Sequence, residues 1–148
     1  IADQTFVRLR PEHVSNVAVI EGNSFALPWS IGDLRRLLGD ADVVCVGALV
    51  EGALAAYGLG YIELEHFHLA SMAVAPDYRR RGIGDALLRH LLQEIKERGC
   101  TRCTLEVRVG NSAARKLYDK AGFKQVRRME GHYDDPEEDG LELALVVG

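Results

Sequence analysis

The segment that leads from a strand-like run into the clearest helix of the sequence combines glycines with arginines. The run ends at Val74, and Gly82 and Gly84 open the helical stretch after three consecutive arginines at positions 79–81. The first turn of a helix carries free backbone N–H groups and a partial positive charge, and both attract phosphate. Glycine lets a ligand approach the backbone, and arginine pairs with phosphate oxygens. This spacing predicts a cradle for a pyrophosphate group.

Two better-known phosphate-binding loops fit this segment poorly. The dinucleotide-binding fingerprint requires a third glycine where the sequence has Leu87. The Walker loop requires Gly-Lys-Ser/Thr, but Gly84 is followed by Asp85. A turn with glycines and solvated arginines that binds nothing is the alternative.

The elements that position this loop follow from hydrophobic periodicity and turn residues. Helices are expected over residues 11–25, 30–39, 82–98 and 111–121, and strands over residues 5–10, 43–50, 53–62, 66–74, 101–109, 123–130 and 141–147. Glu51-Gly52 is a hairpin signal, and an acidic loop separates the last two strands. This order predicts a single α/β (α+β) domain over residues 1–148, with a mixed sheet and helices on both faces.

Composition limits the classes of protein and of partner. The chain has 148 residues, 47% hydrophobic and 27% charged, which suits one globular domain that needs no disulfide or metal to fold. A net charge of −4 argues against nucleic acid as a direct partner, because phosphate backbones require a basic face. The basic residues cluster locally at 79–81, which favours a small phosphate-bearing ligand.

The cysteines and the hydropathy pattern predict an intracellular location. Cys45, Cys100 and Cys103 cannot form a disulfide framework. The Cys100-x-x-Cys103 spacing allows redox or zinc chemistry, but without a second pair reduced thiols are expected. No apolar run approaches the roughly 20 residues of a membrane span, and residues 1–10 do not resemble a signal peptide. The chain lacks an initiator Met, so native residues are expected to be missing, and the predicted location is the cytoplasm.

Residues 79–84, Arg-Arg-Arg-Gly-Ile-Gly, resemble the [Q/R]-x-x-G-x-[G/A] motif of the GNAT acetyltransferase superfamily, whose loop holds the pyrophosphate of coenzyme A. Further stretches resemble one branch, the bacterial ribosomal-protein-alanine N-acetyltransferases (RimI). They are Pro-Trp-Ser at 28–30, Met-Ala-Val-Ala-Pro-Asp-Tyr at 72–78, Leu-Glu-Val-Arg at 105–108, Asn-Ser-Ala-Ala at 111–114, Leu-Tyr at 117–118 and Gly-Phe at 122–123. The resemblance spans nearly the whole chain and implies a mostly antiparallel seven-stranded GNAT sheet.

The resemblance also implies a role for individual residues. A splayed gap in the sheet would hold the acetyl and pantetheine portion of acetyl-CoA against the backbone of Met72, Ala73 and Val74. Glu106 matches the family's general base and Tyr118 its general acid. The remaining contacts with the cofactor would come from Arg79, Arg80, Arg81, Gly82, Ile83, Gly84, Asp85 and Asn111.

The chemistry of amine acetylation suits these residue types. The amine must lose a proton before it attacks the thioester, and the departing thiolate gains one; a carboxylate and a tyrosine hydroxyl serve these two tasks. Transfer can be direct, so no serine or cysteine nucleophile is required. Alternatively, Glu106 is a solvated strand carboxylate and Tyr118 a core tyrosine. His66 and His68 share one strand face and are expected to be polar strand residues rather than metal ligands, with His68 a reserve candidate for the base.

The acceptor is expected to be a protein or peptide N-terminus, such as that of a ribosomal protein. Trp29 and Tyr133 are placed on the acceptor side. Tyr133 resembles one of two paired aromatics of that branch, but its neighbour is His132, and Glu-Asp-Gly-Leu-Glu at 138–142 departs from the branch's Glu-Asp-Ala-apolar pattern. The acidic residues of this region can attract a cationic peptide or polyamine, or simply keep a hairpin loop soluble.

Two alternatives stay open for the function. One is acetylation of a lysine side chain or a small cationic amine; the other is a non-catalytic coenzyme A-binding module, which the presence of both Glu106 and Tyr118 disfavours. The expected protein is a monomer or weak dimer that needs no metal and no membrane.

Overall fold

The computed structural model describes residues 4–25 and 28–148. Its strands form one seven-stranded sheet in the order β1-β2-β3-β4-β5-β7-β6. All neighbouring strands are antiparallel except β4 and β5, which are parallel. The strands are β1 (Gln4–Arg8), β2 (Val43–Val50), β3 (Ala53–Glu63), β4 (His66–Val74), β5 (Arg102–Arg108), β6 (Lys124–Tyr133) and β7 (Glu138–Val146). The predicted mixed, mostly antiparallel sheet is confirmed.

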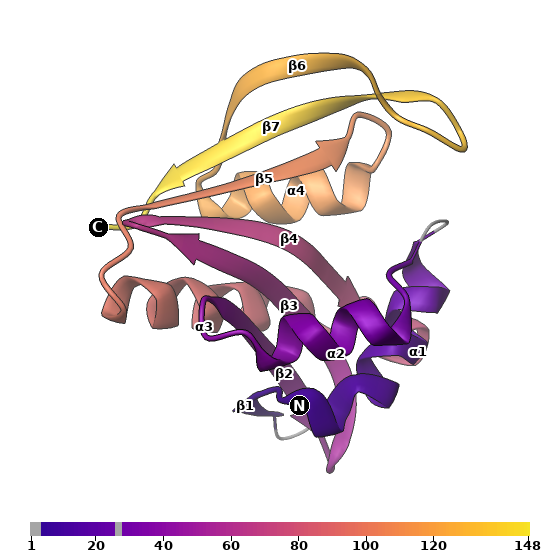
Figure 1. Ribbon diagram of the computed structural model, residues 1–148. Helices are drawn as coiled ribbons and strands as arrows, with labels where there is room; N and C mark the ends of the chain where they lie inside the picture. The colour runs from indigo at the N-terminus through magenta and orange to yellow at the C-terminus, as the bar shows by residue number, and fades with distance from the viewer. Residues whose placement is uncertain (1–3, 26–27) are drawn as a thin grey trace.

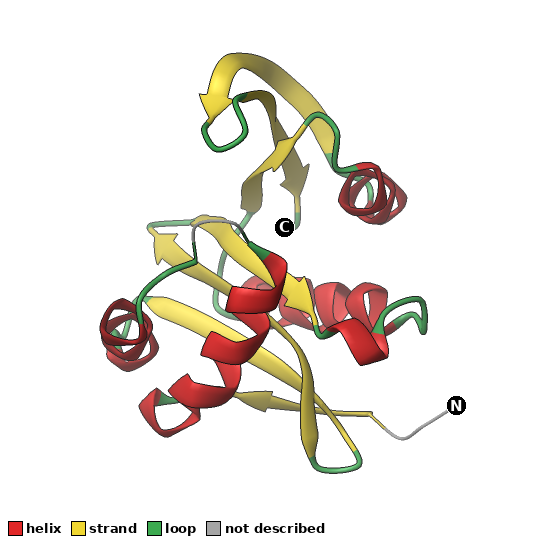
Figure 2. Ribbon diagram, turned by 90° about the vertical axis from the view of Figure 1, so that its right-hand side faces the viewer, coloured by secondary structure: helices red, strands yellow, loops and turns green. Residues whose placement is uncertain are grey.

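Four α-helices cover the two faces of the sheet (Figure 1). They are α1 (Val14–Ser24), α2 (Ile31–Gly39), α3 (Ile83–Glu97) and α4 (Ser112–Ala121). In Figure 1, α1 and α2 lie in front of the sheet and α3 lies behind it. Figure 2 shows the hairpin of β6 and β7 at the end of the sheet opposite the N-terminal strand. Within the described residues, no helix combines the length and apolar character needed to cross a membrane.

Local sequence signals set the ends of these helices. The Ser30 hydroxyl accepts a hydrogen bond from the Asp33 N–H at 3.1 Å and caps α2. The Asn111 side chain caps α4 in the same way, and Gly122 ends that helix in the left-handed conformation, with φ 102°. Pro11 does not begin α1 directly, because a short 3-10 helix (Pro11–His13) precedes it.

Two apolar cores lie on opposite faces of the sheet. On one face, α3 buries Leu87, Leu88, Leu91 and Ile95 completely, as its periodicity predicts. On the other, α1 and α2 contribute a second cluster that contains Val17 and Leu34, also fully buried. Because helices pack against both faces, the sheet is held in a fixed position between the two layers.

The parallel pairing of β4 and β5 is short. It joins His66–Leu69 to Arg102–Leu105 and stops there, although β4 continues to Val74 and β5 to Arg108. Figure 1 shows the two strands diverging beyond this point. The sheet therefore has the splayed gap that the resemblance implies, and the gap opens between Met72 on one strand and Glu106 on the other.

The last two strands are longer than the sequence indicated. The sequence predicts that the first of them ends at residue 130 and that the second begins at residue 141. In the structure β6 continues to Tyr133, which pairs with Glu138 at the start of β7. Cross-strand contacts of charged groups extend the hairpin: Asp139 accepts hydrogen bonds from the Arg128 side chain and from the Gly131 N–H, each at 2.9 Å. Alternation of apolar residues cannot reveal strands held in this way.

Candidate active site

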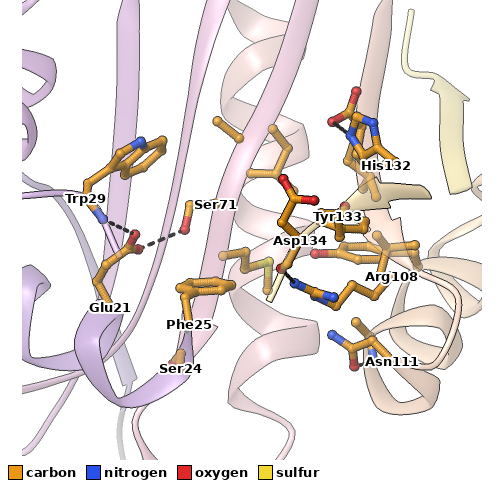
Figure 3. Close-up of a pocket in the computed structure, with 18 of the residues that line it drawn as sticks. Glu21, Ser24, Phe25, Trp29, Ser71, Arg108, Asn111, His132, Tyr133 and Asp134 are labelled. Atoms are coloured by element: carbon orange, nitrogen blue, oxygen red, sulfur yellow. Dashed lines mark hydrogen bonds and ion pairs between the residues drawn. The ribbon is translucent and has the colours of Figure 1, made fainter. Parts of the chain in front are cut away.

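A cavity of about 520 Å³ opens where β4 and β5 separate. This volume lies in the range of small-molecule sites. Six of the residues singled out from the sequence line it: Trp29, Met72, Glu106, Asn111, Tyr118 and Tyr133. Figure 3 shows Glu21, Trp29 and Ser71 on one side of the cavity and Arg108, His132 and Tyr133 on the other.

One wall is built on a buried carboxylate. Glu21 of α1 is 4% exposed and accepts hydrogen bonds from the Ser71 hydroxyl at 3.1 Å, the Trp29 N–H at 3.1 Å and the Tyr57 hydroxyl. Burial and the hydrogen bond to Glu21 raise the pKa of Tyr57, so this phenol stays protonated and keeps donating. The network joins α1, β3 and β4 to the segment before α2 and so fixes Trp29 at the cavity.

The opposite wall is built around Arg108 of β5. Its guanidinium lies 4.6 Å from the centre of the Tyr133 ring and pairs with Glu138 at 3.3 Å. It also donates to the carbonyl oxygens of Asp134 and Pro136, each at 2.9 Å. Burial is the main cause that raises the pKa of Tyr133 to about 12. Arg108 therefore ties the hairpin turn to β5 and holds Tyr133 over the cavity.

The two candidate acid–base residues differ in their surroundings. Glu106 is 35% exposed at its side chain, and its Oε1 lies 2.8 Å from Nε2 of His132. Tyr118 of α4 is 8% exposed and packs edge-on against Phe123, with ring centres 5.6 Å apart. Burial raises the pKa of Tyr118 well above its usual range, so its hydroxyl keeps its proton at neutral pH. The cavity thus brings together a carboxylate that can accept a proton and a phenol that can donate one.

The predicted phosphate loop lies outside the residues that line this cavity and leads into α3. Gly82 is the N-cap with φ 77°, and a side chain there would meet open space. The N–H groups of the first turn that follows have no acceptor within the helix. This exposed turn fits a pyrophosphate group. A Cβ at Gly84 would lie 3.3 Å from Val74, so that glycine also allows α3 to approach β4.

The charged side chains of this loop make contacts within the protein. Arg79 donates to the Val74 carbonyl oxygen at 3.0 Å and reaches the Ser24 hydroxyl at 3.4 Å. Arg81 lies over the Tyr78 ring, 5.4 Å from its centre. Asp85 pairs with Arg89 and lies 3.7 Å from Nζ of Lys120, which links α3 to α4. Arg80 is exposed and has a positive φ of 64°.

The other positions of the predicted cofactor site serve the sheet or a helix end. Met72 and Val74 pack against the core on the α3 side, and the Ala73 side chain is buried on the α1 side; of the three, only Met72 is among the residues that line the cavity. Ile83, the first residue of α3, is buried in the core on that face of the sheet. Asn111 lines the cavity while its Oδ1 accepts from the Ala114 N–H at 3.2 Å.

The acidic region is partly neutralised. Glu138, Asp139 and Glu142 each form an ion pair with an arginine, namely Arg108, Arg128 and Arg127. The remaining acidic side chains, Asp134, Asp135 and Glu137, form no ion pair among the described residues. The negative field near the cavity is therefore weaker than the sequence suggested.

The histidines and cysteines singled out from the sequence take structural positions. His66 and His68 both bond to the hydroxyl of the buried Thr104, at 2.6 and 2.9 Å. Burial lowers the pKa of His68. Cys100 and Cys103 are buried free thiols, and burial raises the pKa of Cys103 to about 12. Among the residues described, no group of three or more His, Cys, Asp or Glu is arranged to hold a metal ion.

Three residues of the site were missed from the sequence: Glu21, Arg108 and His132. Glu21 has a detectable signal, because it falls on the helical face of Val14 and Val17, where a carboxylate is unexpected. Arg108 follows Glu106 by two residues and shares its face of β5. His132 stood out only as the neighbour of Tyr133, and its contact with Glu106 could not be expected because the hairpin that places it was predicted to be a loop.

Known proteins share this fold and much of this sequence. Residues 14–123 match the model of the acetyltransferase (GNAT) family. The ribosomal protein bS18-alanine N-acetyltransferase of Escherichia coli K12 is 35% identical over 86% of this chain and 84% of its own. The corresponding protein of Haemophilus influenzae is 32% identical, with 86% of each chain covered.

A solved structure gives the same result in three dimensions. The crystal structure of the ribosomal-protein-S18-alanine N-acetyltransferase from Escherichia coli matches with a TM-score of 0.92 and 31% identity, over 99% of this chain and 95% of that chain. These matches point to the same family as two features of the structure, the gap between β4 and β5 and the loop before α3. The chain belongs to the GNAT acetyltransferase family and is an acetyl-CoA-dependent N-acetyltransferase.

Proposed function

We propose that this enzyme transfers the acetyl group of acetyl-CoA directly to the α-amine of a protein N-terminus, as its relatives act on the alanine of ribosomal protein bS18. One observation carries the proposal: Glu106 and Tyr118 line the same cavity, at the point where β4 leaves β5. A protein that only bound coenzyme A would need neither a carboxylate nor a protonated phenol there.

Each residue has one task in this mechanism. Glu106 accepts the proton that the acceptor ammonium must lose before it attacks the thioester carbon. Tyr118, kept protonated by burial, donates a proton to the departing thiolate and is reprotonated by the second proton that the nitrogen loses as the amide forms. The backbone of Met72, Ala73 and Val74 orients the acetyl and pantetheine portion, and Asn111 borders it from α4.

The pyrophosphate is assigned to the turn before α3. The N–H groups that follow Gly82 bind its oxygens. The exposed guanidinium groups of Arg80 and Arg81 lie beside that turn and add charge. Arg79 holds the turn to Val74 and Ser24 rather than reaching outward. Asp85 steadies the turn through its pairs with Arg89 and Lys120.

An α-amine suits a single carboxylate base better than a lysine does. Ordinary pKa values are about 7.8 for an α-amine and about 10.4 for lysine, so about a tenth of the former is neutral at pH 7 but under about one part in a thousand of the latter. The difference is worth about 3.5 kcal/mol. Trp29 and Tyr133 border the acceptor side of the cavity and would contact the first residues of the peptide.

The test is thiol release from acetyl-CoA with a panel of acceptors. The panel contains basic peptides that begin Ala-Arg with a free N-terminus, the same peptides N-blocked but containing lysine, and spermidine. Release with the free N-terminus alone, and a product acetylated on the first residue by mass spectrometry, is expected. Release with blocked peptides or spermidine would instead assign a lysine or small-amine acceptor.

The base is tested by Glu106→Gln. This variant should bind acetyl-CoA as the parent does, by calorimetry, and lose about 100-fold or more in kcat, as removal of a positioned proton acceptor does. Unchanged turnover at neutral pH would remove Glu106 as the base.

A further inference from the structure

The imidazole of His132 contacts the carboxylate that we assign as the base. Its Nε2 lies 2.8 Å from Glu106 Oε1, and both residues line the cavity. Figure 3 shows His132 on the same side of the cavity as Tyr133. Within residues 4–25 and 28–148, no other side chain is hydrogen-bonded to Glu106. The His132 side chain is 33% exposed, so the ring reaches from the carboxylate to solvent.

The backbone makes room for this contact. Strand β7 lies between β6, which carries His132, and β5, which carries Glu106. The ring crosses β7 at Gly140, where an added Cβ would lie 3.1 Å from His132 Cδ2 and 2.9 Å from Tyr133 Cε2. The rings of His132 and Tyr133 also pack edge-on, 4.9 Å apart. His132 and Gly140, the two positions at which the sequence departs from the family pattern, therefore lie against each other.

The charged groups on the neighbouring strands β5 and β7 are held by partners of their own, whereas Asp134, which also lines the cavity, forms no ion pair among the described residues. On β7, Asp139 pairs with Arg128 and Glu142 with Arg127; on β5, Arg108 pairs with Glu138 and lies against Tyr133. His68 on β4 is bonded to Thr104. Among the described residues, Glu106 is therefore the one carboxylate bonded to the His132 ring, and the two form an acid–base pair.

The reaction has a proton to dispose of. An ammonium acceptor carries three N–H bonds and the amide product one; the thiol of free coenzyme A retains one of the two protons lost. One proton must therefore reach solvent in each turnover, and a protonated Glu106 must lose it before the next acceptor binds.

We propose that His132 positions Glu106 and carries this proton from the carboxyl group to solvent. Nε2 accepts the proton from the Glu106 carboxyl group, and the imidazolium releases its Nδ1 proton to water, so that the carboxylate is restored and the ring is neutral. Proton exchange with water then returns the ring to the Nδ1–H tautomer, in which Nε2 can accept again. The inference rests on the proposed role of Glu106. It adds a positioning residue that lies outside the motifs shared with the family.

The test is His132→Ala, assayed with saturating acetyl-CoA and the acceptor of the panel that supports turnover. The kcat should fall about 100-fold, the low end of what a positioned proton-transfer group contributes. The KM for acetyl-CoA should stay within about twofold, because the pyrophosphate turn is untouched. Added imidazole should restore kcat in proportion to its concentration, which a merely structural loss would not show. Acetylated product is counted against an enzyme-free blank.

The matched control is His90→Ala. The ring of His90 on α3 stacks on Phe6, 4.5 Å away, and lies outside the cavity, so kcat should keep its parent value and not respond to imidazole. His132→Gln keeps a polar side chain and guards against a folding defect. Both His132 variants should unfold at the same temperature as the parent.

The outcomes separate the two proposals. If kcat of His132→Ala falls by less than about tenfold, or if imidazole does not restore the lost activity, the role of His132 is overturned. The assignment of Glu106 as the base still stands in that case, provided that Glu106→Gln has lost its turnover. If Glu106→Gln turns over normally, the base assignment fails, and the role of His132 fails with it.

Discussion

Tyr118 is the candidate catalytic residue whose surroundings say most about its task. It lines the cavity, and its ring packs edge-on against Phe123. Burial first, and then the proximity of Cys103 and Tyr133, raise its pKa. A general acid must hold its proton until the transition state, and a solvent-exposed tyrosine would begin to lose it near its ordinary pKa of about 10.

Tyr118→Phe should therefore lower kcat about 100-fold and leave the KM for acetyl-CoA nearly unchanged, because only the hydroxyl is lost. In the parent enzyme, the acid form is present below the folded-state pKa. Since that pKa is raised, kcat should not decline between pH 8 and 10. A pH–kcat profile corrected for spontaneous thioester hydrolysis checks this, and an alkaline limb with an apparent pKa below 10 would contradict it.

The turn that begins α3 gives a test of the pyrophosphate assignment. Gly82→Val puts a β-branched residue at φ 77°, a conformation that costs non-glycine residues about 1–2 kcal/mol. It should also place a side chain over the N–H groups of the turn. Calorimetry should show acetyl-CoA binding at least about tenfold weaker, or about 1.4 kcal/mol.

The matched control for Gly82→Val is Gly52→Val. Gly52 lies in the turn between β2 and β3 with φ 83°, and a Cβ there also meets open space. The backbone penalty is the same, but no ligand site is involved, so acetyl-CoA affinity should keep its parent value. Equal loss of affinity in both variants would mean that the effect is one of general stability.

The segment between α1 and α2 depends on Glu21 for its position. In Glu21→Ala, the Trp29 N–H loses its acceptor and the Tyr57 and Ser71 hydroxyls keep only each other. The free energy of unfolding should fall by about 2–3 kcal/mol, since buried donors are left unpaired. The KM for the acceptor peptide should rise more than that for acetyl-CoA. The control is Glu12→Ala at an exposed position, which should change neither the free energy of unfolding nor the KM values. If Glu21→Ala leaves the KM for the acceptor unchanged, Glu21 does not contribute to acceptor binding.

The parts of the structure that could be predicted are those whose cause is local. Helix α3 follows from its apolar face and Gly99, and the hairpin between β2 and β3 from Glu51-Gly52. The parallel pairing and its early end could be expected only through the family resemblance, because a crossover brings together residues that are far apart in the chain. The candidate residues lining the cavity were likewise found by motif.

The parts that could not be predicted depend on contacts between distant charged groups. β6 is exposed along nearly its whole length, and its arginines pair across to β7, so no apolar alternation marked its end. The position of His132 over Gly140, and the ring of donors around Glu21, require a register that only the folded sheet supplies.

The two cores make the whole domain depend on helix packing against both faces of the sheet. Leu91 of α3 is fully buried in the larger core, and Leu91→Ala should lower the free energy of unfolding by about 2–5 kcal/mol. Leu64, 93% exposed in the turn between β3 and β4, is its control, and Leu64→Ala should change stability by less than about 0.5 kcal/mol. Urea denaturation measures both. Equal effects would mean that α3 does not hold the sheet.

The separation of β4 from β5 leaves the sheet with four edges instead of two. Besides β1 and β6, the stretches beyond Leu69 and Leu105 present backbone groups to each other without pairing. Unpaired strand edges invite foreign strands, and here they lie in the middle of the sheet, where a second polypeptide would have to enter between them. Amides that point into this opening should exchange with deuterium in the free enzyme and become protected when substrates bind. The exchange rates of these amides would then report how much of the enzyme has substrate bound in the gap.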